Sequence, residues 1–157
     1  MRPKVYLETT IVSYLTSRSS RDLVIAARKQ ETEEWWEAER ARFDCVISEL
    51  VRREASLGDP EASTRRLQAI DGIPLVALNE QALELAEYLV RARAVPEEFK
   101  EDALHIALSA AHGIDYLLTW NFKHINNVTR REVIEKAIAE AGYSPPAICS
   151  PEELRGE

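Results

Sequence analysis

Four oxygen-bearing side chains follow, or lie near, short apolar runs of the sequence. Glu8 comes directly after KVYL and Asn121 just after DYLLT, while Glu54 and Asp102 lie in segments that adjoin such runs. Carboxylate and amide oxygens suit Mg²⁺ or Mn²⁺, whereas zinc sites rely mainly on nitrogen and sulfur. Such ions polarise phosphate, generate hydroxide and hold a leaving oxygen. If the fold brings these residues together, we expect metal-assisted phosphoryl chemistry with Glu8, Glu54 and Asp102 as ligands.

Asp102 lies beside an apolar stripe instead of opposite it. The stripe has helical spacing and consists of Phe99, Ala103, Ile106, Ala107 and Ala110. A carboxylate at the edge of a buried face is costly unless a partner compensates its charge. A bound cation is a suitable partner, so the position of Asp102 favours the metal hypothesis.

Glu8 and Asn121 also have ordinary structural interpretations. Glu8 precedes the segment TTIVSYL, whose spacing predicts a helix, and the positive end of that helix would favour a nearby carboxylate. Asn121 follows a strand, and asparagine forms turns readily because it tolerates left-handed backbone. Neither interpretation requires a metal ion.

Glu54 and Asp102 could instead be ion-pair residues. Glu54 follows Arg53 and could pair with a base on the surface of its helix. Asp102 could pair with Lys100 or Lys123. These alternatives stay open from the sequence, because the folded distances between the side chains decide among them.

Histidine and cysteine give little support for a zinc site. His105 and His112 share a helix face, but there is no HExxH motif and no cysteine at ligand spacing. We expect His105 at the core boundary near Asp102, as a hydrogen-bond partner. Cys45 and Cys149 belong to no CxxC pair, and we interpret them as buried free thiols.

Short β-rich runs alternate with segments of helical spacing along the whole chain. Thr9 or Thr10, Asn79 and Thr129 are expected as helix N-caps, and Gly113 as a helix end. The expected strands are 4–7, 44–48, 73–78, 115–119 and 147–149. The expected helices are 8–15, 21–43, 49–57, 59–70, 79–93, 95–113 and 129–142, with a turn at 150–154.

This alternation predicts an α/β fold. Strands that read as all-apolar runs between helices indicate a mainly parallel sheet covered on both faces, that is, a three-layer α/β/α arrangement. No repeat or domain break interrupts the chain, so we expect one domain over residues 1–157. Ligands of open α/β sheets bind beyond the carboxyl ends of the strands. Glu8 and Asn121 would meet there if their strands are neighbours.

Composition limits the function classes. The 157 residues, 45% hydrophobic, suffice for one domain with a sizeable core. No apolar run approaches the roughly 20 residues of a membrane span, and the N-terminus lacks a signal-peptide core, so the cytoplasm is the expected compartment. The net charge of −7 argues against broad nonspecific affinity for nucleic acid. It does not exclude a nuclease, because bound metal ions invert the local field of an acidic site.

Four stretches of the sequence together resemble the PIN domain, and specifically the VapC-like toxin ribonucleases. VYLETTIVSYL resembles the family's opening strand, acid and helix, and VISELVRREAS resembles its second segment, with an acid six positions after a strand-end serine. EDALHIALSAAHGIDYLLTWN resembles the most specific stretch, an aspartate on a helix followed by a strand that closes in Thr-x-acid. ICSPEEL resembles the closing strand and turn. Each motif is short, but their order and spacing are fairly specific.

The resemblance implies a metal-dependent ribonuclease that hydrolyses RNA phosphodiesters with Mg²⁺ or Mn²⁺. The catalytic residues would be Glu8, Glu54, Asp102 and Asn121, with Thr119 in support. Glu8 and Asn121 both stand where the family usually has aspartate. The amide at Asn121 keeps an oxygen but removes a charge, which should weaken one ion of a pair. The alternative is a catalytically weak or inactive PIN-like module that binds RNA or another partner.

The resemblance also implies partners. Proteins of this family commonly form homodimers, and a small antitoxin masks the toxin in a VapBC-type toxin–antitoxin pair. The expected helix 21–43, with Trp35 and Trp36, is a candidate contact surface for such a partner.

Overall fold

The structure is a computed structural model that describes residues 1–156. Five parallel strands form the centre of its fold. The strand order is β3-β2-β1-β4-β5, and every pair of neighbours is parallel. The predicted α/β class with a parallel sheet between helices is therefore confirmed. The strands are β1 (Lys4–Leu7), β2 (Asp44–Ser48), β3 (Leu75–Val76), β4 (Tyr116–Leu118) and β5 (Ala147–Cys149).

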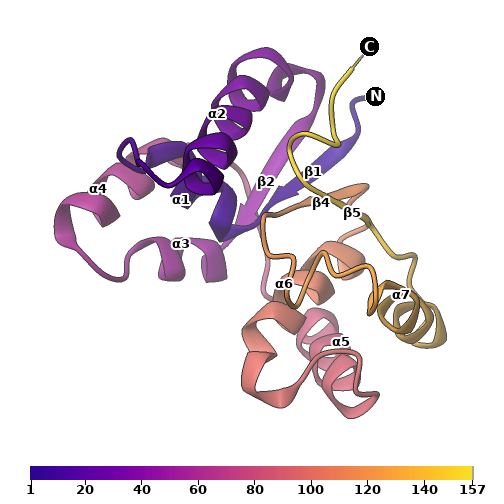
Figure 1. Cartoon of the computed structure of the whole chain (residues 1–157). Helices are drawn as coiled ribbons and strands as arrows, with labels where there is room; N and C mark the ends of the chain where they lie inside the picture. Colours follow the sequence, from indigo (N-terminus) through magenta and orange to yellow (C-terminus); the bar gives the residue numbers. More distant parts are fainter. Residues whose placement is uncertain (157) are drawn as a thin grey trace.

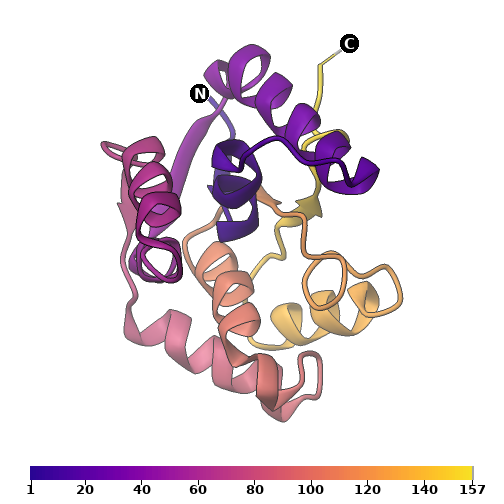
Figure 2. The same ribbon diagram turned by 60° about the vertical axis from the view of Figure 1, so that its left-hand side comes forward.

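Helices cover both faces of this sheet. Figure 1 shows α1 to α4 gathered on one side and α5 to α7 on the other, and Figure 2 shows the same two groups after a 60° turn. The helices are α1 (Thr9–Thr16), α2 (Leu23–Ala38), α3 (Glu49–Ala55), α4 (Pro60–Ala69), α5 (Glu80–Arg91), α6 (Lys100–Ala111) and α7 (Arg131–Glu140). Two short 3₁₀ turns are η1 (Arg40–Arg42) and η2 (Glu97–Phe99).

The central strand β1 positions the rest of the sheet. Tyr6 pairs with Val46 of β2 on one side and with Leu117 of β4 on the other. Tyr6 and Leu117 are fully buried, as expected for parallel strands with helices on both faces. The carboxyl ends of β1, β2 and β4 consequently lie at the same edge of the sheet.

Two expected strands are shorter than predicted. The run 73–78 contributes only Leu75 and Val76 to β3, which is an edge strand paired with β2 alone. Pro74 precedes it and has no N–H to donate to a ladder. The run 115–119 contributes only Tyr116–Leu118 to β4. Its last residue, Thr119, is free for side-chain contacts in the site.

Helix ends differ from the sequence expectations in four places. The expected helix 21–43 ends at Ala38 and is followed by η1, and the expected helix 95–113 begins as η2. The N-cap of α1 is Glu8, so the prediction of Thr9 or Thr10 was wrong. The prediction of Thr129 for α7 was also wrong, because Thr129 hydrogen-bonds to Asn127 instead.

Other boundaries agree with the sequence. Asn79 caps α5 through a 2.9 Å bond from the Ala82 amide to its Oδ1. Gly113 follows α6 with a φ of +65°, a conformation that glycine adopts without steric cost, and so lets the chain turn into β4. None of the helices in residues 1–156 is long and apolar enough to cross a membrane.

Candidate functional site

Polar side chains from four elements converge at the carboxyl edge of the sheet. Glu8 ends β1 and starts α1, and its amide donates to the Leu118 carbonyl of β4 over 3.1 Å. Glu54 lies on α3, which follows β2 directly, and Asp102 lies in the first turn of α6. Each helix adjoins a strand of the sheet, so the order of the chain brings these acids to one edge.

Glu8 is a buried carboxylate held by hydroxyl groups. Its side chain is among the buried polar groups of the protein, with the residue 4% exposed. Thr10 Oγ1 and Thr119 Oγ1 donate to its Oε1 over 2.5 and 2.6 Å. All hydrogen bonds that the described residues make to this carboxylate fall on Oε1. Oε2 is therefore available to a ligand.

Glu54 is held in the same manner but by a different pair of donors. Thr9 Oγ1 donates to Glu54 Oε1 over 2.5 Å, and His105 Nε2 lies 2.7 Å from the same oxygen. Burial acts to raise the pKa of Glu54, but the hydrogen bond and charge of His105 outweigh it and lower that pKa overall. Glu54 is therefore ionised at neutral pH.

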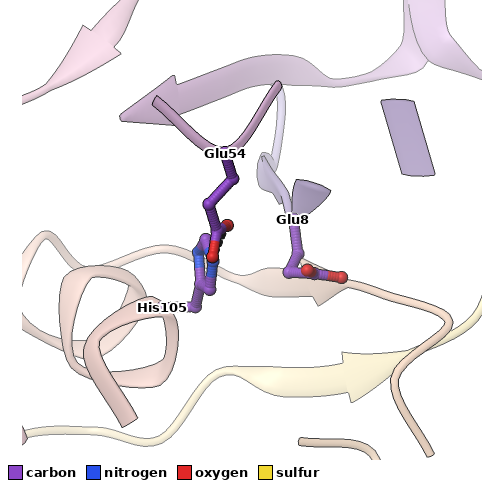
Figure 3. Close-up of side chains that lie close together, drawn as sticks. All are labelled: Glu8, Glu54 and His105. Carbon is purple, nitrogen blue, oxygen red and sulfur yellow. Dashed lines mark hydrogen bonds and ion pairs between the residues drawn. The ribbon is translucent and has the colours of Figure 1, made fainter. Parts of the chain in front are cut away.

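His105 lies underneath Glu54 and is almost completely buried, with 1% exposed. One oxygen each of Glu8 and Glu54 and a ring nitrogen of His105 lie within 4.8 Å of one another. Figure 3 shows these three side chains close together. Both ring nitrogens already have partners, because Nδ1 lies 2.7 Å from the Tyr6 hydroxyl. A cation could reach this imidazole only by breaking one of these bonds. We therefore assign His105 as a partner of Glu54 and not as a ligand.

Asp102 is the third acid of this group, and the charge of Glu8 acts on it. Burial raises its pKa, and the charge of Glu8 adds to that rise, while His105 and a hydrogen bond from the Asn121 side chain act in the opposite direction. Asp102 is therefore close enough to Glu8 and Asn121 for their charges and dipoles to act on it. It lies outside the tight group that Glu8 and Glu54 form with His105.

In the part of the chain that the structure describes, His105 is the basic side chain that pairs with one of these acids, Glu54. Within residues 1–156, no lysine or arginine forms an ion pair with Glu8, Glu54 or Asp102. The ion pairs considered from the sequence, with Arg53, Lys100 or Lys123, are therefore not formed. Carboxylate oxygens without a lysine or arginine partner are the donor set of a hard divalent ion, so the residues present fit Mg²⁺ or Mn²⁺.

Asn121 mainly stabilises the turn after β4. Its side-chain Oδ1 accepts from the backbone amides of Lys123 and His124 over 3.2 and 3.0 Å. The backbone amide of Asn121 donates to Thr119 Oγ1 over 2.9 Å. The turn-forming interpretation is thus correct. The amide side chain also affects Asp102, so Asn121 borders the acidic group while its oxygen is already used.

Sequence reasoning missed the residues that hold the carboxylates. Tyr6, Thr9, Thr10 and Ser48 received no role in the site, and His105 was expected next to Asp102 instead of against Glu54. Thr9 and Thr10 directly follow Glu8, so their hydroxyls were a usable signal. Tyr6 reads as an ordinary strand residue, and nothing in the sequence places it against a histidine 99 positions away.

A pocket lies beside this site and not in it. It measures about 670 Å³ and lies among α3, α5 and α6. Arg53 and Glu101 line it, and they are the sequence neighbours of Glu54 and Asp102. The four candidate catalytic residues do not line it, so its volume says nothing about their chemistry.

No protein-family model matches the chain, and no curated protein matches it significantly. The likeness of the four sequence stretches to PIN domains therefore stays a prediction. A fold of this class hosts many unrelated functions, so function has to be argued from the site.

Proposed function

We propose that this protein is a metal-dependent ribonuclease that hydrolyses RNA phosphodiester bonds, and that it acts as the toxin of a VapBC-type toxin–antitoxin pair. One observation carries the catalytic part. Glu8, Glu54 and Asp102 gather at the carboxyl edge of a parallel sheet, and no lysine or arginine of the described chain pairs with them. A divalent cation is the partner that this arrangement lacks.

In this proposal, one oxygen of each glutamate accepts hydrogen bonds from neighbouring side chains and the other binds the cation. Glu8 and Glu54 each use Oε1 for hydrogen bonds, which leaves Oε2 to face a cation, and Asp102 is the third carboxylate. Bound Mg²⁺ or Mn²⁺ would supply polarisation of the phosphate and activation of water. The hydroxyls of Thr10 and Thr119 hold Glu8 Oε1 in a fixed orientation.

RNA as the substrate, the toxin role and the antitoxin partner rest on the sequence resemblance. The net charge of −7 agrees with a site that attracts phosphate through a bound cation and not through a basic surface. A homodimer and a small antitoxin are part of the same proposal.

The experiment is a cleavage assay on structured RNAs with Mg²⁺, Mn²⁺ or EDTA. We expect cleavage with either ion and none with EDTA. Asp102→Asn should lower the rate at least about 100-fold, because it removes a carboxylate charge from the metal site. Glu101→Gln is the matched control, since Glu101 neighbours Asp102 on α6 but faces the adjoining pocket. Equal activity of Asp102→Asn and the unaltered protein would refute the proposal.

One observation favours the alternative of a weak or inactive PIN-like module. Asn121 Oδ1 is used by the turn amides of Lys123 and His124, so the position offers a cation little. RNA binding without cleavage at millimolar Mn²⁺ would select this alternative. The toxin role is tested separately by expression in bacteria, where growth arrest should disappear with Asp102→Asn.

A further inference from the structure

A buried chain of hydrogen bonds runs from the core of the sheet to the candidate site. Ser48 Oγ lies 2.8 Å from the Tyr6 hydroxyl, that hydroxyl lies 2.7 Å from His105 Nδ1, and His105 Nε2 lies 2.7 Å from Glu54 Oε1. Tyr6 and Ser48 are fully buried and His105 is 1% exposed. The chain connects β1, the end of β2, α6 and α3.

Burial makes this chain expensive unless it is fully paired. A hydroxyl or imidazole that is removed from water without a new partner loses its hydrogen bonds to water and gains none in return. Here each of these groups has one, and Ser48 Oγ also accepts the Val51 amide over 3.3 Å at the start of α3. Burial raises the pKa of Tyr6 well above its ordinary value, so the phenol keeps its proton. Tyr6 can therefore always donate, either to His105 or to Ser48.

Core stability alone does not require these polar groups. Apolar side chains of similar size at Tyr6 and His105 would fill the same space without any polar group to satisfy. What the chain produces is a fixed imidazole with an N–H directed at one carboxylate oxygen, and a T-shaped contact between the Tyr6 and His105 rings, 5.7 Å between centroids, helps to hold it. Carboxylates that bind metal ions are commonly held by such outer hydrogen bonds.

We propose that His105 is a positioning residue, held from behind by Tyr6 and Ser48, that fixes Glu54 Oε1 and thereby aims Oε2 at the cation. This inference rests on the proposed metal-dependent function. His105 does not touch the cation or the RNA. Its effect reaches both through Glu54.

The experiment measures Mn²⁺ affinity by calorimetry and electron paramagnetic resonance, independently of catalysis. His105→Leu removes the donor to Glu54 and should weaken Mn²⁺ binding about tenfold. His105→Gln restores an N–H at the distal position and should recover most of that loss. Tyr6→Phe deletes only the hydroxyl behind the imidazole, and it should weaken binding by a smaller factor. If His105→Leu fails to fold, the Gln and Phe variants carry the test.

A double-mutant cycle separates positioning from general damage. Tyr6→Phe should have no further effect on Mn²⁺ affinity in a Glu54→Gln background, because it acts through Glu54. The control is Ser109→Ala, which removes a buried hydroxyl bonded to the His105 carbonyl on the same helix and should leave Mn²⁺ affinity unchanged. Folded His105 and Tyr6 variants with unaltered Mn²⁺ affinity would overturn the inference, as would an equal effect of Tyr6→Phe with and without Glu54.

RNA cleavage measured on the same preparations keeps the two proposals apart. Cleavage by the unaltered protein together with Mn²⁺ affinity that ignores His105 would reject only the positioning role. Mn²⁺ binding that depends on His105, without cleavage of any RNA, would reject only the ribonuclease.

Discussion

Asn121 accepts hydrogen bonds with its side-chain oxygen and donates one with its side-chain nitrogen, whereas an aspartate could only accept. Its Oδ1 accepts two backbone amides of the turn after β4, and the hydrogen bond from its side chain to Asp102 opposes the rise that burial causes in the pKa of that acid. An aspartate could accept the same two amides, but it could not donate to Asp102. Two carboxylates would then face each other, which is unfavourable unless a cation lies between them.

The change Asn121→Asp should therefore destabilise the metal-free protein and strengthen its binding of metal. We expect tighter Mn²⁺ binding, by about tenfold, and a lower melting temperature in EDTA than that of the unaltered protein. Calorimetric titration with Mn²⁺ and thermal unfolding in EDTA check the two parts. Weaker or unchanged Mn²⁺ binding would mean that position 121 does not border the metal site.

Thr119 is the second residue whose chemistry decides the site. It is fully buried, donates to Glu8 Oε1 over 2.6 Å and accepts the Asn121 amide over 2.9 Å. One hydroxyl thus connects the acid at the end of β1 to the turn after β4. The supporting role that the resemblance implies for Thr119 stays a prediction, and the hydrogen bond to Glu8 is the contact through which it would act.

Thr119→Val keeps the shape of the side chain and removes the hydroxyl. We expect a loss of about 1–3 kcal/mol in the free energy of unfolding, because Glu8 and the Asn121 amide each lose a partner in a buried place. Urea unfolding measures the loss. Thr119→Ser keeps the hydroxyl and is the control, and equal stability of the Val and Ser variants would contradict this account of the site.

Helix α2 forms hydrogen bonds to two distant segments of the chain, the loop after β4 and the turn after β5. Trp35 is fully buried and its Nε1 donates to the Leu154 carbonyl over 2.9 Å, which holds the turn after β5. Trp120 Nε1 donates to Thr32 Oγ1 over 2.8 Å, which holds the loop that carries Asn121. Trp35 therefore belongs to the core, and its proposed role in a contact surface for a partner is wrong. Trp36 remains partly exposed, with Arg40 over its ring.

Trp35→Phe tests α2 as an element apart from the site. It keeps an aromatic ring against Phe43 but leaves the Leu154 carbonyl without its donor. We expect a loss of about 1–3 kcal/mol in the free energy of unfolding and an unchanged Mn²⁺ affinity. A large fall in Mn²⁺ affinity at constant stability would show that α2 controls the site more directly than its contacts indicate.

The stability of the whole molecule should fall in alkaline solution because of two thiols. Burial raises the pKa of Cys45 to about 11 and that of Cys149 to about 12, against an ordinary value of 9.0. Below pH 9 both thiols keep their protons in the folded and the unfolded chain. Above pH 9 only the unfolded chain releases them, so unfolding becomes more favourable as the pH rises toward the folded pKa values.

At pH 10 we expect Cys149 alone to lower the free energy of unfolding by about 1 kcal/mol relative to pH 8. Urea unfolding of the unaltered protein and of Cys149→Ala between pH 7.5 and 10.5 measures this. The difference in stability between the two proteins should shrink as the pH rises. A difference that stays constant over this range would mean that the thiol ionises equally in both states.

The residue pattern by itself predicted a mainly parallel sheet and the succession of strands and helices along the chain. These follow from local regularities, namely all-apolar strand runs, helical spacing and signals such as Asn79 and Gly113, which act over a few residues. The pattern predicted that Glu8 and Asn121 meet at one edge only if their strands are neighbours, and the structure shows that β1 and β4 are. The sequence predicted helix ends less accurately. The N-caps are Glu8 for α1 and Arg130 for α7 instead of the predicted threonines, because these ends depend on residues that are neighbours in space.

Only the tertiary structure decided how the acids are held. Tyr6, Ser48, His105 and Glu54 come from four elements, and the two bonds of His105 join residues 99 and 51 positions apart. Side-chain hydrogen bonds over such separations depend on the packing of helices against the sheet, which no local pattern encodes. The same packing leaves one oxygen of Glu8 and one of Glu54 free, and that detail makes the site a candidate metal centre.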